Sequence, residues 1–267
     1  EGSSEVRDWE TKWMVEHGID AEIYCWYRQP TSKSEPIKRP RNSFELHDAY
    51  FNSEYSDMIK FAIAWENGGA QTTGFEDFAE NIVPYWIEQY FKDDRYLVID
   101  NKPVVVFYTY NNLVRDFGSQ AGAKQALDYL DSECRKLGFD GAYLLTTTGS
   151  ANKTLLENIE KVGFDGIYCY SWDINCGDIN VQKNGMTAQR DTNTVSVIAT
   201  VGMGRDDTPW ERSPGTFTDP ADYEELLKWV RDEYVPKSKK GTIASKMITL
   251  DNWNEYGEGH YLAPSPL

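Results

Sequence analysis

The chain has 267 residues, a length that suits either one α/β barrel or two smaller domains. Its formal net charge of -16 argues against a nucleic-acid ligand, because phosphate binding needs clustered Lys and Arg and no such cluster is visible. Aromatic residues make up 14% of the chain, with 9 Trp and 17 Tyr, and flat amphipathic rings suit both core packing and stacking against sugars. A neutral partner such as a carbohydrate is therefore favoured.

Four cysteines show neither CxxC spacing nor a neighbouring His cluster, so we expect no metal site. Cys25 and Cys169 lie in apolar runs and are expected in the core, whereas a disulfide between Cys169 and Cys176 stays open. No run of about 18 apolar residues is present, so we expect no insertion into a membrane. No charged-then-apolar leader opens the chain, although one could have been removed.

Short β-rich runs alternate with amphipathic helical stretches, which is the pattern of parallel βα units. The stretches GFDGAYLLT and GFDGIYCYS, which begin at Gly138 and Gly163, repeat one helix–turn–strand junction and indicate successive equivalent units. Helices are expected at residues 5–17, 49–57, 76–90, 122–137, 152–162 and 220–234. Strands are expected at residues 20–26, 58–65, 102–108, within 138–146 and 163–171, and at 195–202 and 245–250.

This order predicts a single (β/α)8 TIM-type barrel domain over residues 1–267. Only seven strands are recognised, so the first strand either lies upstream of residue 1 or is missed. The alternative is an open doubly wound sheet. No Gly-x-Gly-x-x-Gly follows any predicted strand, so the usual dinucleotide cradle is absent and no cofactor is expected.

Aromatic and polar residues gather directly after the predicted strands, where a (β/α) barrel has its active site. A ring beside a hydrogen-bonding group is typical of the lining of a carbohydrate cleft. The alternative is that strand ends are often Tyr-rich and loops often polar. The residues expected to bind substrate are Trp65, Glu66, Tyr108, Tyr110, Tyr170, Trp172, Asp207, Trp210, Trp253, Asn254, His260 and Tyr261.

The last predicted strand leads into Glu255-Tyr256-Gly257-Glu258, where two glutamates flank a predicted β-turn. Gly257 stands at the third position, where type II geometry needs a positive φ. Such a turn brings the two glutamate Cα atoms within about 7 Å, so the carboxylates repel each other and one pKa rises. The result is one acid and one base, the division of labour that glycoside cleavage needs. The alternative is a pair of solvated surface charges.

The segment WNEYGEG at residues 253–259 resembles the Trp-Asn-Glu-aromatic-x-Glu-Gly signature that ends the barrel of glycoside hydrolase family 99-like proteins, including their WbsX-type group. Its extension through His260 and Tyr261 is also similar to the WNDYGESHY stretch of family 71 α-1,3-glucanases. Weaker matches to the first group are GIDAEIY at 18–24, AWEN at 64–67, NKPV at 101–104 and RDDTP at 205–209.

The resemblance implies a retaining glycoside hydrolase that acts on α-linked glycans. Glu258 would be the general acid/base, and Glu255 would deprotonate the 2-hydroxyl of the sugar, which attacks the anomeric carbon to give a 1,2-anhydro sugar. A direct nucleophile returns as an option if Glu66 or Asp207 reaches the same cleft. A silent sugar-binding barrel and a glycosyltransferase remain alternatives, although no Rossmann-like half accompanies Asp206 and Asp207.

The expected partner is an oligosaccharide or polysaccharide. We expect a monomer. A periplasmic or secreted location would suit a protein that degrades polysaccharides.

Overall fold

The computed structural model describes residues 2–28, 34–68, 72, 74–172, 175–212 and 214–264. These residues form two compact units, Glu1–Leu145 and Thr146–Leu267. Parallel strands and helices alternate in each unit, which confirms the predicted α/β class. The single-domain organisation stays a prediction.

The first unit is built on three parallel strands. β1 (Ala21–Trp26) pairs with β2 (Lys60–Trp65), and β2 pairs with β4 (Lys102–Phe107). All residues of β4 except the first are buried, because its continuous apolar run packs on both faces. The short β3 (Val98–Ile99) adds an antiparallel partner to β4. The predicted strands at 20–26, 58–65 and 102–108 are thus confirmed.

Helices of the first unit follow the predicted segments, with less regular geometry in two of them. α1 (Ser4–Glu16) is capped by Ser3, whose hydroxyl accepts a hydrogen bond from the Val6 amide. α4 (Tyr110–Asp116), which was not predicted, precedes α5 (Gln120–Lys136). The predicted helix at 49–57 forms as η1 (Phe44–Ala49), η2 (Tyr50–Asn52) and η3 (Ser56–Met58). The predicted helix at 76–90 forms as α2 (Phe75–Asp77), η4 (Phe78–Ile82), α3 (Val83–Trp86) and η5 (Ile87–Phe91).

Aromatic rings fill the core of the first unit. The Trp26 and Trp86 rings meet edge to face at 5.3 Å, and Trp65 stacks on Phe78 at 5.9 Å. Trp65 is 0% exposed. Much of the Trp content of the chain therefore serves packing in this unit.

The second unit repeats the βα pattern. β5 (Tyr143–Thr147) crosses the boundary between the units, and α6 (Lys153–Val162) ends at Gly163, whose φ of 115° fits the predicted junction. The remaining elements are β6 (Gly166–Tyr168), α7 (Ile179–Arg190), β7 (Ser196–Val197), β8 (Ala199–Gly202), α8 (Pro220–Trp229) with its extensions η7 (Val230–Tyr234) and η8 (Val235–Lys237), η9 (Ile243–Ser245) and β11 (Ile248–Asp251).

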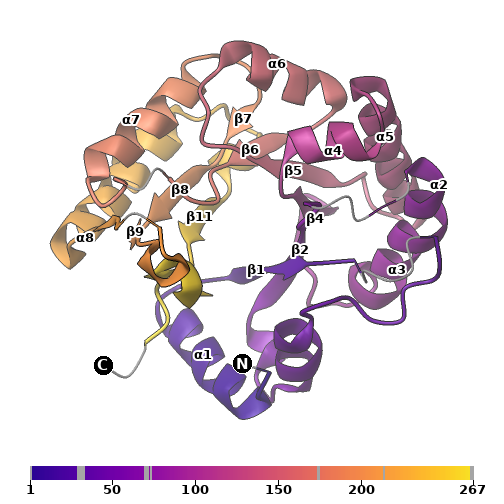
Figure 1. Ribbon diagram of the computed structural model, residues 1–267, viewed down its shortest axis with the longest axis horizontal. Coiled ribbons are helices and arrows are strands. Elements are labelled where there is room, and N and C mark those ends of the chain that lie inside the picture. Colours follow the sequence, from indigo (N-terminus) through magenta and orange to yellow (C-terminus); the bar gives the residue numbers. More distant parts are fainter. Residues whose placement is uncertain are drawn as a thin grey trace. The chain divides into compact units, whose positions relative to one another are not determined.

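The run predicted as one strand at 195–202 is two strands, because pairing changes at Ile198. β7 pairs in parallel with β6, whereas β8 pairs in parallel with β11. This second pair sets Gly202 opposite Asp251. Helices α7 and α8 lie beside β8 (Figure 1) and cover it with an apolar cluster that includes Met186, Val201 and Leu226.

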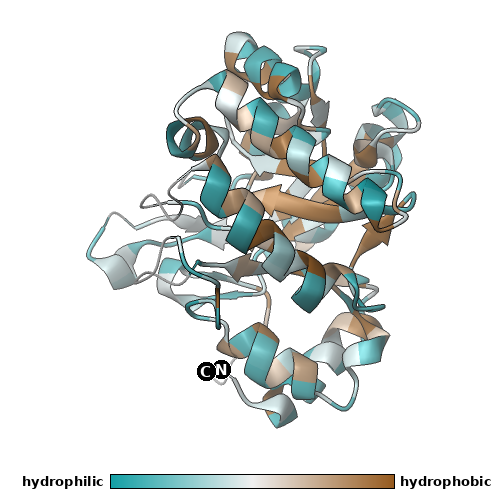
Figure 2. Cartoon of the chain, turned by 90° about the vertical axis from the view of Figure 1, so that its right-hand side faces the viewer, coloured by the Kyte–Doolittle hydropathy of each residue, from teal (hydrophilic) through white to brown (hydrophobic). Residues whose placement is uncertain are grey.

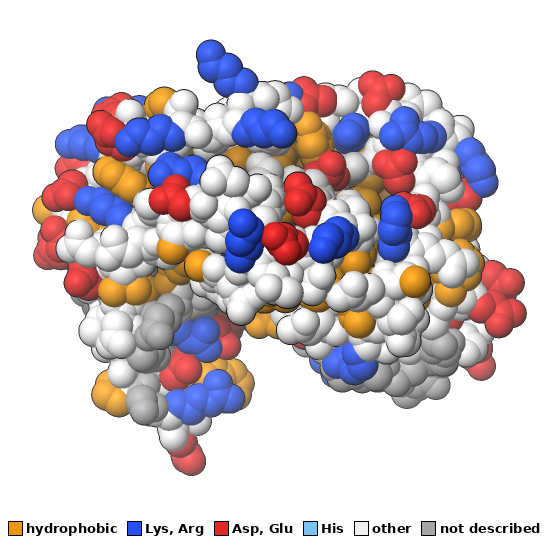
Figure 3. Space-filling view, turned by 90° about the horizontal axis from the view of Figure 1, so that it is seen from above, with side chains coloured by type: hydrophobic (Ala, Val, Ile, Leu, Met, Phe, Trp, Pro, Cys, Tyr) orange, Lys and Arg blue, Asp and Glu red, His pale blue; other side chains and the backbone are white. Residues whose placement is uncertain are grey.

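Hydropathy follows this layout: the long strands near the centre of Figure 2 are brown, and the helices carry bands of teal and brown. Acidic and basic side chains lie interspersed on the face shown in Figure 3. Such interspersion is expected where helices carry pairs such as Lys228 with Glu224, at 2.6 Å.

No helix among the described segments is long and apolar enough to cross a membrane.

The cysteines correct one prediction. Cys25 is exposed, because it points away from the core between the buried Tyr24 and Trp26 on a strand whose side chains alternate. Cys169 is buried, as expected. All four cysteines are thiols, so the Cys169–Cys176 disulfide does not form.

Candidate active site

A short hairpin after the last strand carries both predicted catalytic glutamates. β12 (Asn254–Glu255) pairs antiparallel with β13 (His260–Tyr261), so that Asn254 lies opposite Tyr261 and Glu255 lies opposite His260. The 3₁₀ turn η10 (Tyr256–Glu258) connects the two strands. The hairpin therefore gathers Glu255, Glu258 and His260.

The predicted turn geometry is wrong in one detail. The left-handed residue is Gly259, with a φ of 63°, and Gly257 has no positive φ. A Cβ at position 259 would lie 2.7 Å from the Asp206 carbonyl oxygen, so only glycine fits there. The Asp206 amide in turn donates to the Glu258 carbonyl over 3.0 Å, which fixes the backbone that carries the second glutamate.

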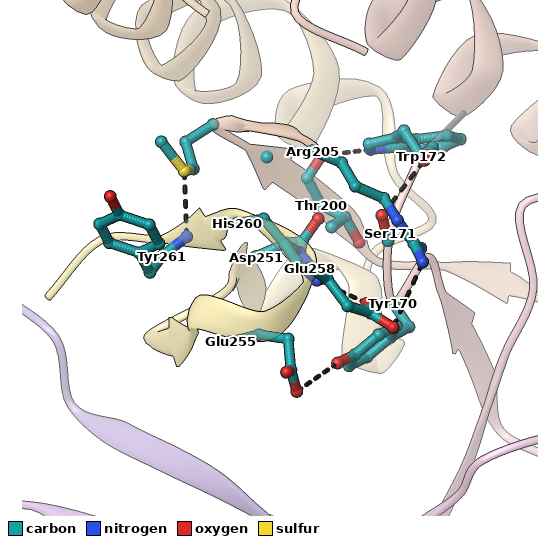
Figure 4. Close-up of polar contacts among 12 residues, drawn as sticks. Tyr170, Ser171, Trp172, Thr200, Arg205, Asp251, Glu255, Glu258, His260 and Tyr261 are labelled. Carbon is teal, nitrogen blue, oxygen red and sulfur yellow. Dashed lines mark hydrogen bonds and ion pairs between the residues drawn. The ribbon is translucent and has the colours of Figure 1, made fainter. Parts of the chain in front are cut away.

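His260 links two carboxylates. Its Nδ1 lies 2.8 Å from Asp251 Oδ1, and its Nε2 lies 2.9 Å from Glu258 Oε2 (Figure 4). The ring is 0% exposed. Because both ring nitrogens already have carboxylate partners, the predicted role of His260 as a ligand of a sugar hydroxyl does not fit its surroundings.

Asp251 ends β11 and is buried beneath the hairpin. Its Oδ1 contacts His260, whereas its Oδ2 has no hydrogen-bond partner among the described residues. Gly202 lies directly opposite on β8, and a Cβ there would come within 3.0 Å of Asp251 Oδ2. His260 is therefore the main group that offsets the cost of burying the Asp251 carboxylate.

Glu258 lies between two cationic side chains. Arg205, on β9 (Gly204–Arg205), which pairs with β10 (Thr216–Phe217), places Nη2 3.3 Å from Glu258 Oε1. The same guanidinium is held by Asp207, whose Oδ1 lies 2.7 Å from Arg205 Nε. The hydrogen bond from His260 lowers the pKa of Glu258 and, with the charge of Arg205, outweighs the opposing effect of burial.

Glu255 has a different environment. The Tyr170 hydroxyl lies 3.5 Å from Glu255 Oε2 and is the polar contact drawn for this carboxylate in Figure 4. Burial, and then repulsion from Glu258, raise the pKa of Glu255. The two carboxyls therefore differ in their affinity for a proton: Glu258 favours the ionised form and Glu255 binds a proton more readily.

The surroundings of His260 favour its cationic form at neutral pH. Burial alone would disfavour the charged ring, but the hydrogen bonds to Asp251 and Glu258 raise the pKa of His260 to about 9. The Tyr170 ring meets the imidazole edge-on at 5.7 Å. Burial raises the pKa of Asp251, whereas the hydrogen bond and the charge of His260 act to lower it, so an imidazolium at this position favours the ionised form of Asp251.

Exposed rings lie beside the hairpin. Trp210, at the end of η6 (Thr208–Trp210), is 57% exposed, and a Cβ on Gly257 would lie 3.0 Å from its ring. Tyr256 and Tyr261 pack against each other at 4.8 Å. Trp210 and Tyr256 have the exposure that stacking against a sugar requires, whereas Tyr261 is half-buried.

Other predicted substrate residues of the second unit take different positions. Trp172 is 6% exposed and donates from Nε1 to the Thr200 carbonyl over 3.1 Å, so its surroundings are those of a core residue and are at odds with the predicted role. Trp253 and Asn254 are half-buried on the way into the hairpin. Asp207 contacts Arg205, and through it acts on the surroundings of Glu258.

The predicted residues of the first unit show a similar division. Trp65 is a core residue, as described above, and this burial is at odds with stacking against a substrate. Tyr110 is also buried, at the start of α4. Glu66 and Tyr108 are half-buried, and Glu66 Oε1 accepts a hydrogen bond from the Gly68 amide over 3.1 Å. Their contact with substrate stays a prediction.

Two residues of the site were not among the predicted site residues. Asp251 is the last residue of an apolar strand, and its position at the carboxyl end of that strand was a usable signal. Arg205 becomes important only through the hairpin β9–β10, which the strand pattern did not reveal. Within the parts of the chain that the structure describes, no cluster of three or more His, Cys, Asp or Glu could hold a metal ion.

Parallel βα units define the α/β class of this chain, and solved structures confirm a (β/α)8-barrel fold. The GH99 endo-alpha-mannosidase from Bacteroides thetaiotaomicron superposes with a TM-score of 0.60 at 18% identity, covering 97% of this chain and 69% of that one. The same type of enzyme in complex with BIS-TRIS-Propane gives a TM-score of 0.61 at 17% identity, covering 99% and 75%.

Residues 2–192 match the family described as Glycosyltransferase WbsX, and the chain belongs to this family. The family predicted from the terminal motif is thus confirmed. A search of curated proteins found no match.

Proposed function

We propose that this protein is a retaining glycoside hydrolase that cleaves α-linked glycans with Glu255 and Glu258. The observation that supports this function is the hairpin β12–β13, which brings two carboxyls of unlike proton affinity together beside exposed rings. The fold shared with an endo-alpha-mannosidase makes α-mannose-containing glycans the first substrates to test. Degradation of such glycans would suit a periplasmic or secreted protein.

Glu255 is suited to act as the base. A raised pKa makes its carboxylate a stronger proton acceptor, with an affinity closer to the working pH. It would remove the proton of the 2-hydroxyl of the sugar, and the freed oxygen would attack the anomeric carbon. The leaving oxygen would take a proton from Glu258, and water would later open the 1,2-anhydro sugar with net retention.

The experiment is hydrolysis of α-mannan oligosaccharides and a wider panel of α-linked glycans by purified protein. Glu255→Gln and Glu258→Gln should each lower the rate by about 100-fold or more. Glu224→Gln is the matched control, because Glu224 is an exposed glutamate that pairs with Lys228 on a helix surface. Full activity in both site variants, or release of the inverted anomer in proton NMR, would reject the mechanism.

Sugar transfer is a second candidate, favoured by the description of the family. The same intermediate could be opened by a sugar hydroxyl in place of water, with Glu258 accepting its proton. Adding acceptor sugars at rising concentration separates the two activities. A hydrolase gives mainly free reducing sugar, whereas a transferase gives elongated products and little hydrolysis.

A further inference from the structure

The contacts of Glu258 raise a question that the proposed function leaves open. A general acid must supply a proton, yet Glu258 accepts from His260 and lies 3.3 Å from Arg205, so two cations favour its ionised form. Glu255 faces the Tyr170 hydroxyl instead. The proton for the leaving oxygen must therefore be held close to Glu258 rather than on it.

We propose that His260 stores the proton that Glu258 delivers to the leaving oxygen, and that buried Asp251 fixes the ring for this task. This inference rests on the proposed function. It makes His260 and Asp251 positioning residues that act through Glu258, at a place where no contact with substrate is needed.

The geometry supports a shared proton. With Asp251 Oδ1 at 2.8 Å, the Nδ1 position is held as a donor by a carboxylate that has no other partner among the described residues. Nε2 then faces Glu258 Oε2 at 2.9 Å, so one proton between these two atoms can belong to either. Burial of the ring keeps water away from the imidazole nitrogens.

The proton moves from His260 to Glu258 and from there to the leaving oxygen. The Nε2–H bond of the imidazolium breaks and an O–H bond forms on Glu258 Oε2, which leaves a neutral ring and a neutral carboxyl. That O–H bond then breaks as the leaving oxygen takes the proton together with the electron pair of the glycosidic bond. In the second half, the attacking water gives one proton to Glu258, and Glu258 returns it to His260. Glu255 meanwhile returns its proton to the 2-oxygen.

The charged and titratable groups around His260, Glu258 and Asp251 come from several elements. His260 is faced directly by Glu258 on η10, by Asp251 on β11 and by the phenol ring of Tyr170. Farther groups also act on the three residues. Glu255 interacts with both Glu258 and His260, and Arg205 and Asp207 act on Glu258. Cys169, Tyr223 and Arg205 lie in the field of Asp251. Tyrosine and cysteine are neutral at pH 7, so the carboxylates and Arg205 dominate.

Nitrogen-15 NMR of the three histidines tests where the proton resides without any need for substrate. The His260 signals, assigned by their loss in His260→Gln, should report an imidazolium at pH 7 that titrates near pH 9. In Glu258→Gln and in Asp251→Asn the titration should fall by about one pH unit or more, because each removes a stabilising charge. His17→Gln, at the exposed end of α1, should leave the His260 titration unchanged. A neutral His260 ring at pH 7 in the unmodified protein would overturn the proposal.

Kinetics then separate this proposal from the proposed function. On α-mannan oligosaccharides, His260→Gln should lower kcat/KM about 100-fold at pH 7, mostly through kcat, and shift the high-pH limb of the profile toward lower pH. On a dinitrophenyl α-mannoside, whose leaving group needs no proton, the loss should be about tenfold or less. An unchanged pH profile in His260→Gln would reject proton storage while the function stands. Full activity of Glu258→Gln on the oligosaccharides would reject the function itself.

Discussion

The buried imidazolium predicts that the stability of the protein depends on pH. His260 has its pKa raised from 6.5 to about 9 in the folded chain. A gap of about 2.5 pH units, at about 1.4 kcal/mol per unit, corresponds to about 3.5 kcal/mol of unfolding free energy. Because the folded pKa is the higher one, this contribution is complete below pH 6.5 and is lost as the pH rises to about 9.

Urea unfolding at pH 6 and at pH 9.5 measures this contribution. The unmodified protein should lose about 3 kcal/mol more than His260→Gln over this range, since the variant has no proton to release at that position. His17→Gln serves as the control and should lose as much stability as the unmodified protein. If His260→Gln and the unmodified protein lose the same amount, His260 carries no extra proton and the reasoning is wrong.

Three further substitutions test other assignments. Trp65→Ala should lower the unfolding free energy by about 3–5 kcal/mol in a denaturant titration, because it empties a fully buried site in an aromatic core. Trp210→Ala should cost less than about 1 kcal/mol, since this ring is 57% exposed, but should weaken sugar binding in calorimetry. Equal binding by Trp210→Ala would remove this ring from the proposed site. Asn152→Ala removes the side-chain oxygen that accepts a hydrogen bond from the Leu155 amide at the start of α6. It should lower the unfolding free energy by about 1 kcal/mol and with it the Tm. An unchanged Tm would refute this helix cap.

Much of the fold could be predicted because it depends on local patterns. The apolar runs at 58–65 and 102–108 became β2 and β4, and the repeated Gly-Phe-Asp-Gly stretches ended two helices with glycines at φ 96° and 115°. Hydrophobic period and glycine caps act within a few residues, so a single sequence contains them. The terminal motif likewise led to the correct family.

What could not be predicted depends on pairing between distant segments. The division of 195–202 into β7 and β8 follows from two different partner strands, a choice that no local pattern records. The turn at Gly259 is set by the approach of Asp206, and the pairing of His260 with Asp251 depends on how the hairpin folds back over β11. Helix α7 was missed because its stretch, INVQKNGMTAQR, contains a glycine and little apolar period.

Gly202 has no functional group, yet Asp251 on β11 and Gln182 on α7 leave little room for a side chain at this position. Gln182 holds its amide and its carbonyl, each over 2.8 Å, so the backbone cannot withdraw. The space above it is occupied by Asp251 Oδ2, 3.0 Å from where a methyl group would stand. In a library of random variants selected for sugar cleavage, position 202 should therefore tolerate few alternatives to glycine, and a survey of reactive groups alone would overlook it.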